Sequence, residues 1–210
     1  MYSEAYSVGN SRRSWDSLVR QPLAADRQHW QRKGFATGKR GAAAWFALLS
    51  HGGFRATVVH RVAYWAHRNQ IRGLPTLLHE LNQALHGIEM TPSIPIGAGL
   101  YMPHSVGSVI TARSIGANVE LQGGITIGQR RDGGFPLLAD GAQIACGARV
   151  LGPISIGANA TVGANAVVIR DVPPGALAVG VPARALQRRP LTEPGTGPQW
   201  AVDSAAVESG

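Results

Sequence analysis

The chain has 210 residues, which is enough for one main domain and a smaller appended unit. Its 27 glycines and 13 prolines accompany a hydrophobic share of 44%, which excludes both a collagen-like triplet chain and a wholly disordered one. The net charge of +8 comes from the first third, since residues 1–75 carry 12 basic and 3 acidic side chains and residues 76–210 carry 8 and 9.

The N-terminal segment, residues 1–35, is polar and basic and has no sustained periodicity, so we expect it to be mobile or only locally helical. Its charge suits an anionic membrane surface, nucleic acid or a polyanionic substrate, and equally a solvated face without a partner. Nucleic acid is disfavoured because no aromatic platform or recognisable binding motif accompanies the charge.

Residues 36–88 form a predicted α-helical region, because apolar side chains such as Leu77, Leu81 and Leu85 recur at helical spacings. Gly52-Gly53 and Gly73-Leu74-Pro75 divide this region into about three short helices. The apolar run 42–49 is too short to span a bilayer, and the first residues lack the apolar core of a signal peptide. We expect a cytoplasmic protein, and the basic helices are candidates for peripheral contact with the inner face of the membrane, with a solvated face as the favoured alternative.

The pattern changes after Gly87, where aliphatic residues begin to recur at six-residue intervals. Each unit has an aliphatic residue followed by a small or turn-forming pair, as in IGANVE and VGANAV, which suits a short strand and a tight corner. Three units close a triangular coil of 18 residues, and about four to five coils fit between Met90 and Val172, within a β-helix domain of residues 89–186. The expected fold is mainly β, a parallel β-helix of hexapeptide repeats. The predicted inward residues are Met90, Ile96 and Met102; Val109, Ile115, Leu121 and Ile127; and Leu138, Ile144, Val150, Ile156, Val162 and Val168.

Two steps break the six-residue period, and irregular loops on a rigid scaffold are where function is expected. The step from Met102 to Val109 is seven residues, so the corner that carries His104 holds one extra residue. The step from Ile127 to Leu138 is eleven, and the inserted sequence GQRRDGGFPL, which includes Phe135, predicts an extruded loop.

His104 is the candidate general base, because an imidazole with a pKa near about 6.5 can accept a hydroxyl proton at neutral pH. The alternative is an ordinary turn histidine, as most of the seven histidines must be. Gln122 and Gly123 occupy the corner one coil above and are candidates to receive substrate or to supply an amide to a developing oxyanion.

The single cysteine, Cys146, excludes an internal disulfide, and no Cys/His cluster has zinc spacing, so we expect no metal. Cys146 occupies a repeated small-residue position without a histidine in its unit, so we interpret it as a packing residue and not as a nucleophile. The tail, residues 187–210, lacks a strand or helix period and is expected to be disordered.

The stretches HRVAYWAH, HGIEMTPSIPIGAGLYMPH, LQGGITIGQ, ACGARVLGPISIG, VGANAVVIRDVPP and AVGVPARAL resemble the serine acetyltransferases, and more closely their polysaccharide-acetylating branch. The resemblance implies a left-handed β-helix, a homotrimer, and acetyl-CoA bound between neighbouring subunits. It also implies that His104 is the catalytic base and that Glu89, fifteen residues earlier, is the carboxylate that orients it.

The resemblance further implies coenzyme A contacts at Ala145, Cys146, Gly163 and Ala164, and at Arg184 near the phosphates, although corner packing and a solvated arginine are the alternatives. Two positions depart from true serine enzymes, which usually have Asp and His where this chain has Pro103 and Phe135. We therefore expect transfer to a hydroxyl of a sugar or polysaccharide precursor first, serine O-acetylation second, and a non-catalytic binding β-helix third, with Phe135 near the acceptor.

Overall fold

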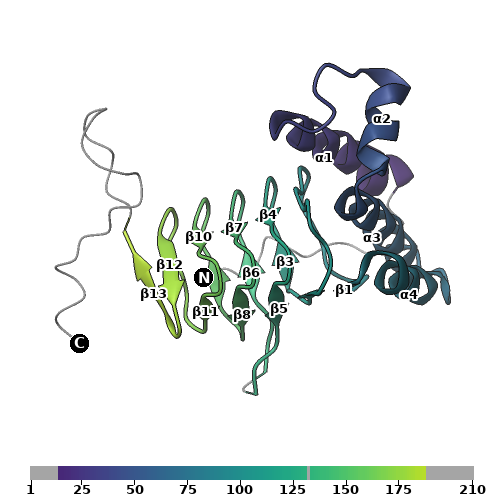
Figure 1. Ribbon diagram of the computed structural model, residues 1–210. Coiled ribbons are helices and arrows are strands. Elements are labelled where there is room, and N and C mark those ends of the chain that lie inside the picture. The colour runs from purple at the N-terminus through teal and green to yellow at the C-terminus, as the bar shows by residue number, and fades with distance from the viewer. Residues whose placement is uncertain (1–13, 132, 188–210) are drawn as a thin grey trace, which may run out of the picture.

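The computed structural model describes residues 14–131 and 133–187 of the chain (Figure 1). The predicted mobility of residues 1–13 and disorder of residues 188–210 lie outside this range. The helices in the described part are η1 (Asp16–Arg20), a short π-helical turn, α1 (Gln21–Arg32), α2 (Gly41–Leu49), α3 (Gly52–Arg68) and α4 (Leu74–His86). The strands are β1 (Ile88–Met90), β2 (Ser108–Ile110), β3 (Ser114–Ile115), β4 (Glu120–Leu121), β5 (Thr126–Gly128), β6 (Leu137–Leu138), β7 (Gln143–Ile144), β8 (Arg149–Leu151), β9 (Ser155–Ile156), β10 (Thr161–Val162), β11 (Val167–Val168), β12 (Leu177–Gly180) and β13 (Ala183–Leu186).

The strands form a three-sided prism of about five turns, which confirms the predicted left-handed parallel β-helix. Its faces are the sheets β1-β2-β5-β8-β11, β3-β6-β9 and β4-β7-β10-β12, in which each strand pairs in parallel with the strand one coil away. At the last coil the chain reverses, because β13 pairs antiparallel with β12. Figure 1 shows the helices gathered at the opposite end of the prism, against the first coil.

The interior of the prism is the aliphatic ladder that the six-residue period predicts, with one correction. Val109 is half-buried and faces outward, whereas the next residue, Ile110, is fully buried and pairs with Met90 and Ile127. The corner of His104 therefore holds two extra residues and not one. The period could not reveal this shift, because both neighbouring residues are aliphatic and a strand turns only alternate side chains inward.

Gly and Asn in the left-handed backbone conformation turn the chain at the corners. Along one edge Gly107, Gly124, Gly147 and Asn165 all have positive φ, and they follow one another from coil to coil. A Cβ on Gly147 would overlap the side-chain oxygen of Asn165 above it. The repeated Gly and Asn of the hexapeptides are thus required both by the backbone conformation and by the close stacking of the coils.

The predicted extruded loop is present between β5 and β6, and Figure 1 shows it hanging away from the prism. Its far end returns to the scaffold at Pro136, whose carbonyl accepts a 2.8 Å hydrogen bond from the backbone N–H of Arg113. The loop therefore leaves the prism at the edge that joins the β5 face to the β6 face.

The helical region begins before residue 36, because α1 is firmly packed. Trp30 of α1 is fully buried and makes edge contacts with Phe35, Phe54 and Tyr101, the last of which belongs to the first coil. The polar composition of residues 1–35 concealed this helix, because the residues that it buries include Asp26 and His29 beside Trp30. No helix in the described part of the chain is long and apolar enough to cross a membrane.

A buried ion pair joins the helices to the β-helix. Asp26 of α1 and Arg61 of α3 are almost inaccessible to solvent, and Arg61 donates hydrogen bonds of 2.9 and 3.1 Å to the two carboxylate oxygens. Asp26 also accepts from the backbone N–H groups of Gly99 and Leu100, at 2.8 and 2.7 Å. Arg61 in turn donates to the carbonyls of Ile96 and Gly97. Burial raises the pKa of Asp26, and the positive charge of Arg61 opposes that shift.

We predict that Asp26→Asn destabilises the protein by about 3–5 kcal/mol, because it leaves the buried guanidinium of Arg61 without a counter-charge. Denaturant unfolding followed by circular dichroism measures this loss. Asp16→Asn is the matched control, since it breaks the exposed pair with Arg20 and should leave the unfolding midpoint nearly unchanged. Equal effects of the two substitutions would contradict the anchoring role of Asp26.

Candidate functional site

One edge of the prism collects most of the candidate residues, and we call it the His104 edge. It is the edge at which the chain passes from the β4-β7-β10-β12 face to the β1-β2-β5-β8-β11 face. Residues 102–107, 122–124, 145–147 and 163–165 form its successive corners. Candidates that are far apart in the sequence thus lie in one column, spaced by roughly 4.8 Å per coil.

His104 is exposed on the first corner of this edge, next to the helices. A Cβ added to Gly123 would lie 3.0 Å from the Cβ of His104, so Gly123 stacks directly on His104 from the next coil. The predicted neighbourhood of His104 with Gln122 and Gly123 is therefore present. The imidazole has no hydrogen-bond partner among the described residues, so both ring nitrogens are available to a ligand.

The corner of His104 is held in place by the ends of two helices. The side-chain hydroxyl of Ser105 donates a 2.8 Å hydrogen bond to the carbonyl of His86, at the end of α4. The backbone N–H of Gly107 donates a 2.9 Å hydrogen bond to the carbonyl of Gly87. At the start of α3, Gly53 lies so close to the carbonyl of Met102 that a Cβ there would overlap it. The longer corner is therefore supported from outside the β-helix and is not a free loop.

Glu89 lies on β1, beside the same corner. It is half-buried and pairs in register with Val109 of β2, which directly follows the His104 corner. The carboxylate makes no hydrogen bond to His104, and neither group has another partner among the described residues. The structure thus brings the expected acid near the histidine without closing the pair.

Small residues continue the His104 edge above Gly123. Ala145, Cys146, Gly163 and Ala164 occupy the next two corners, as the repeat predicts, and Cys146 is exposed. The backbone N–H groups of Gly123, Cys146 and Ala164 donate to no other described residue, although the carbonyls of Gly123 and Cys146 accept hydrogen bonds from Gly147 and Asn165. A column of free amide donors suits a long, thin ligand with carbonyl groups.

Arg184 lies at the far end of this column. It is exposed on β13 and pairs with Val179 of β12, and Val179 covers Gly163 of the coil below. The column runs for about four coil spacings, roughly 19 Å, from the corner of His104 to the end that carries Arg184. A guanidinium there can meet an anionic end of a ligand whose other end reaches His104.

Phe135 is not brought near His104 within one chain. Its ring is 39% exposed on the extruded loop, which is packed through Gly134 against Pro153 at a different edge of the prism. Only a second chain placed beside the first could bring this loop over the His104 edge.

Arg149 on β8 is a residue that the sequence analysis missed. Its guanidinium donates to the carbonyls of Gly124 and Gly147, at 2.5 and 3.0 Å, and so ties together two successive corners of the His104 edge. The repeat could not single it out, because a basic residue at an outward strand position is usually solvated. Within the part of the chain that the structure describes, no group of three or more His, Cys, Asp or Glu is placed to hold a metal ion.

Comparison with known proteins finds no matching family model but many relatives. The chain is 38% identical to the serine acetyltransferase of Synechococcus elongatus over 67% of this chain and 59% of that protein. It is 34% identical to the serine acetyltransferase of Helicobacter pylori strain J99 over 69% of this chain and 86% of that protein. The chain thus spans about six tenths of the cyanobacterial relative and most of the Helicobacter one.

Solved structures agree with these relatives. The soybean serine acetyltransferase complexed with serine superposes with a TM-score of 0.72 and 33% identity, covering 81% of this chain and 70% of that one. A serine acetyltransferase in complex with CoA gives a TM-score of 0.67 and 27% identity, covering 79% and 68%.

We predict that Arg149→Met lowers the free energy of unfolding by about 1–2 kcal/mol, because the carbonyls of Gly124 and Gly147 lose a charged donor. Chemical denaturation compared with the wild type measures the change. Arg113→Met removes an exposed arginine from the same β-helix and should stay within about 0.5 kcal/mol of the wild type. A loss no larger than that of the control would show that Arg149 does not hold the edge.

Proposed function

Because the chain belongs to the serine acetyltransferase family, we propose that it transfers an acetyl group from acetyl-CoA to a hydroxyl oxygen, with His104 as the general base. The observation that carries this proposal is the His104 edge. It offers an unpartnered imidazole, a stacked glycine and a column of free amides that leads to Arg184. No other edge of the prism combines these groups within the described residues.

His104 supplies the proton chemistry of the proposed reaction. Its neutral ring nitrogen accepts the proton of the acceptor hydroxyl while that oxygen bonds to the thioester carbonyl carbon. The imidazolium then returns this proton to the sulfur as the carbon–sulfur bond breaks, so the products are the acetyl ester and the free thiol. Positioned proton transfer of this kind typically contributes a factor of about 10²–10⁴ to the rate.

Glu89 is proposed as the group that positions the imidazole. A carboxylate bonded to one ring nitrogen selects the tautomer that leaves the other nitrogen free to accept a proton, and it stabilises the imidazolium. Glu89 lies on the neighbouring strand and has no competing partner among the described residues, which supports this assignment. The pair is proposed to close when substrate is bound, since catalytic hydrogen bonds often tighten only then.

The column of small residues is proposed as the coenzyme A track. The amides of Cys146 and Ala164 fit the carbonyls of a pantetheine arm, with Ala145 and Gly163 lining it and Arg184 near the phosphates. Gly123 N–H is placed next to His104, where an amide can stabilise the negative charge that develops on the thioester oxygen. Bulky side chains at these corners would block the track.

We propose serine as the first acceptor, which reverses the order expected from the sequence. The relatives are named serine acetyltransferases and none of those described above is a polysaccharide enzyme, so the finer resemblance to that branch is not supported. A sugar hydroxyl remains the second candidate, because Pro103 and Phe135 cannot offer the charged or hydrogen-bonding groups that hold an amino acid. Gln122, on the corner above Pro103, is proposed to contact either acceptor.

We also propose that the active site lies between subunits of a trimer. Phe135 and His104 lie on different edges of the prism of one chain. A neighbouring chain is therefore needed to bring the loop of Phe135 over an acceptor bound at His104. Cyclic assemblies of this kind repeat one heterologous contact until the ring closes.

We predict that His104→Ala lowers turnover of acetyl-CoA with its best acceptor by about 10²–10⁴, while coenzyme A still binds. Release of the free thiol, followed with a thiol reagent, measures turnover, and calorimetry measures binding. Glu89→Gln should lower turnover less and shift its pH profile, which a purely structural role would not do. Turnover unchanged in His104→Ala would refute the proposed base, and absence of turnover and binding in the wild type would favour a non-catalytic β-helix.

The acceptor is decided in the same assay. Serine and a panel of sugars are compared by kcat/KM, with His104→Ala as the blank for each. A higher kcat/KM for serine than for any sugar supports serine as the acceptor. A higher kcat/KM for a sugar would instead make the sugar the acceptor. A gain of serine activity in Pro103→Asp/Phe135→His would then show that these two positions account for the poor binding of serine.

We predict that His104→Ala and Phe135→Asp subunits complement each other. Each variant alone should be impaired, but mixed trimers contain sites with an intact histidine from one chain and an intact loop from the next. Co-expression with two different tags, tandem purification and the same thiol assay measure the recovered activity. No recovery in mixed trimers, or full activity of Phe135→Asp alone, would contradict a site shared between subunits.

A further inference from the structure

The helical region carries an exposed apolar face that the proposed reaction does not use. Phe46 and Leu49 lie three residues apart on α2, and Leu77, Leu81 and Leu85 follow one another at four-residue intervals on α4, so each set shares one side of its helix. Their exposed fractions run from 39% for Leu81 to 81% for Phe46. We call these five residues the apolar helix face. Such clusters on a folded chain mark an interaction surface.

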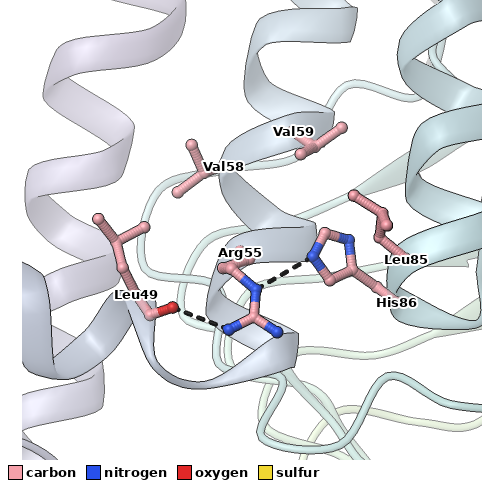
Figure 2. A pocket seen from close by; sticks show the side chains of 6 residues that line it. All are labelled: Leu49, Arg55, Val58, Val59, Leu85 and His86. Carbon is pink, nitrogen blue, oxygen red and sulfur yellow. Dashed lines mark hydrogen bonds between the residues drawn. The ribbon is translucent and has the colours of Figure 1, made fainter.

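A groove connects the two helices of this face. It has a volume of about 500 Å³ and is lined by Leu49 of α2, by Arg55, Val58 and Val59 of α3, and by Leu85 and His86 of α4. Figure 2 shows Leu49 and Leu85 on opposite sides of the α3 residues, so the groove continues the apolar helix face into the bundle.

Arg55 places one positive charge at the end of this groove. Its guanidinium donates to the carbonyl of Leu49 at 2.9 Å and to Nε2 of His86 at 3.3 Å, as Figure 2 shows. Burial and the charge of Arg55 lower the pKa of His86, so this histidine stays neutral and adds no second charge. Nη2 of Arg55 has no partner among the described residues and can donate to an anionic group.

Basic residues precede both helices of the apolar helix face, and no acidic residue occurs between Asp26 and Glu80. Lys39 and Arg40 directly precede α2, and Arg72 lies just before α4. All three are exposed and none takes part in an ion pair within the described residues. Apolar side chains flanked by unpaired cations are the combination that binds the surface of an anionic bilayer.

We propose that the apolar helix face docks on an anionic phospholipid bilayer, with Phe46 and Leu85 entering the interface and Arg55 meeting a lipid phosphate. A second copy of the chain is the less suitable occupant, because a two-fold contact would bring the same basic residues against each other. The inference goes beyond the proposed acetyl transfer and does not depend on it, since binding to lipid is measured without turnover.

The experiment is flotation of the full chain with vesicles of phosphatidylcholine, with or without phosphatidylglycerol. We expect binding only to the vesicles that contain phosphatidylglycerol. This binding should fall sharply between about 0.1 M and about 1 M NaCl, as the Debye length shrinks from about 10 Å to about 3 Å. Phe46→Ser/Leu85→Ser and, separately, Lys39→Gln/Arg40→Gln/Arg72→Gln should each weaken partitioning by about tenfold or more.

Matched controls separate this face from unspecific adsorption. Val181→Ser and Arg170→Gln remove an exposed apolar residue and an exposed charge from the β-helix and should partition like the wild type. Circular dichroism verifies the fold of every variant. Equal binding to both kinds of vesicle, no binding by the wild type, or equal losses in the controls would overturn the proposal. So would a smaller assembly of Phe46→Ser/Leu85→Ser in light scattering, because the face would then be a contact between chains.

Discussion

The buried pair of Asp26 and Arg61 is the constraint on which the arrangement of the molecule depends. The first coil of a β-helix has no preceding coil with which to pair. Here its backbone is hydrogen-bonded instead to Asp26 of α1 and Arg61 of α3, through Ile96, Gly97, Gly99 and Leu100. Of these two helices, α3 also lies against Met102 at the next corner, where α4 accepts a hydrogen bond from Ser105. Helix α3 thus contributes both to the ion pair and to the support of the His104 corner. Removing one partner of such a pair is costly, because it leaves the other charge buried without a counter-charge.

The fold was predictable because one physical requirement, an inward aliphatic residue every sixth position, is repeated many times. The prediction failed where the requirement is ambiguous, at Val109 and Ile110, since either side chain satisfies it and only the strand register decides. It also failed to identify α1, whose burial of Trp30 and Asp26 depends on partners far along the chain. Irregular steps identified the corner of His104 and the loop of Phe135. Arg149 gave no such signal, because its role depends on carbonyls that only the stacked coils bring together.

The prism separates the proposed tasks by edge. One edge carries the imidazole, the free amides and Arg184, which suits the proposed binding of coenzyme A and proton transfer. Another edge carries the loop of Phe135, where this chain departs from the serine enzymes. Changes in that loop can alter the acceptor without disturbing the aliphatic ladder, because the loop lies outside the six-residue register. The acceptor can therefore vary within one family while the scaffold stays the same.

The two ends of the prism are closed in different ways. A stack of parallel coils exposes unpaired backbone N–H and C=O groups at each terminus, and these groups could accept another stack and extend into a fibre. At the first coil the helices cover this surface, and at the last coil β13 turns back and pairs antiparallel with β12. Within residues 133–187, the outer edge of the last coil is formed by β13, which runs antiparallel to the coils and begins directly after Pro182, which has no N–H to donate. The helices that support the corner of His104 thus cover the first coil, and the strand that carries Arg184 covers one face of the last coil.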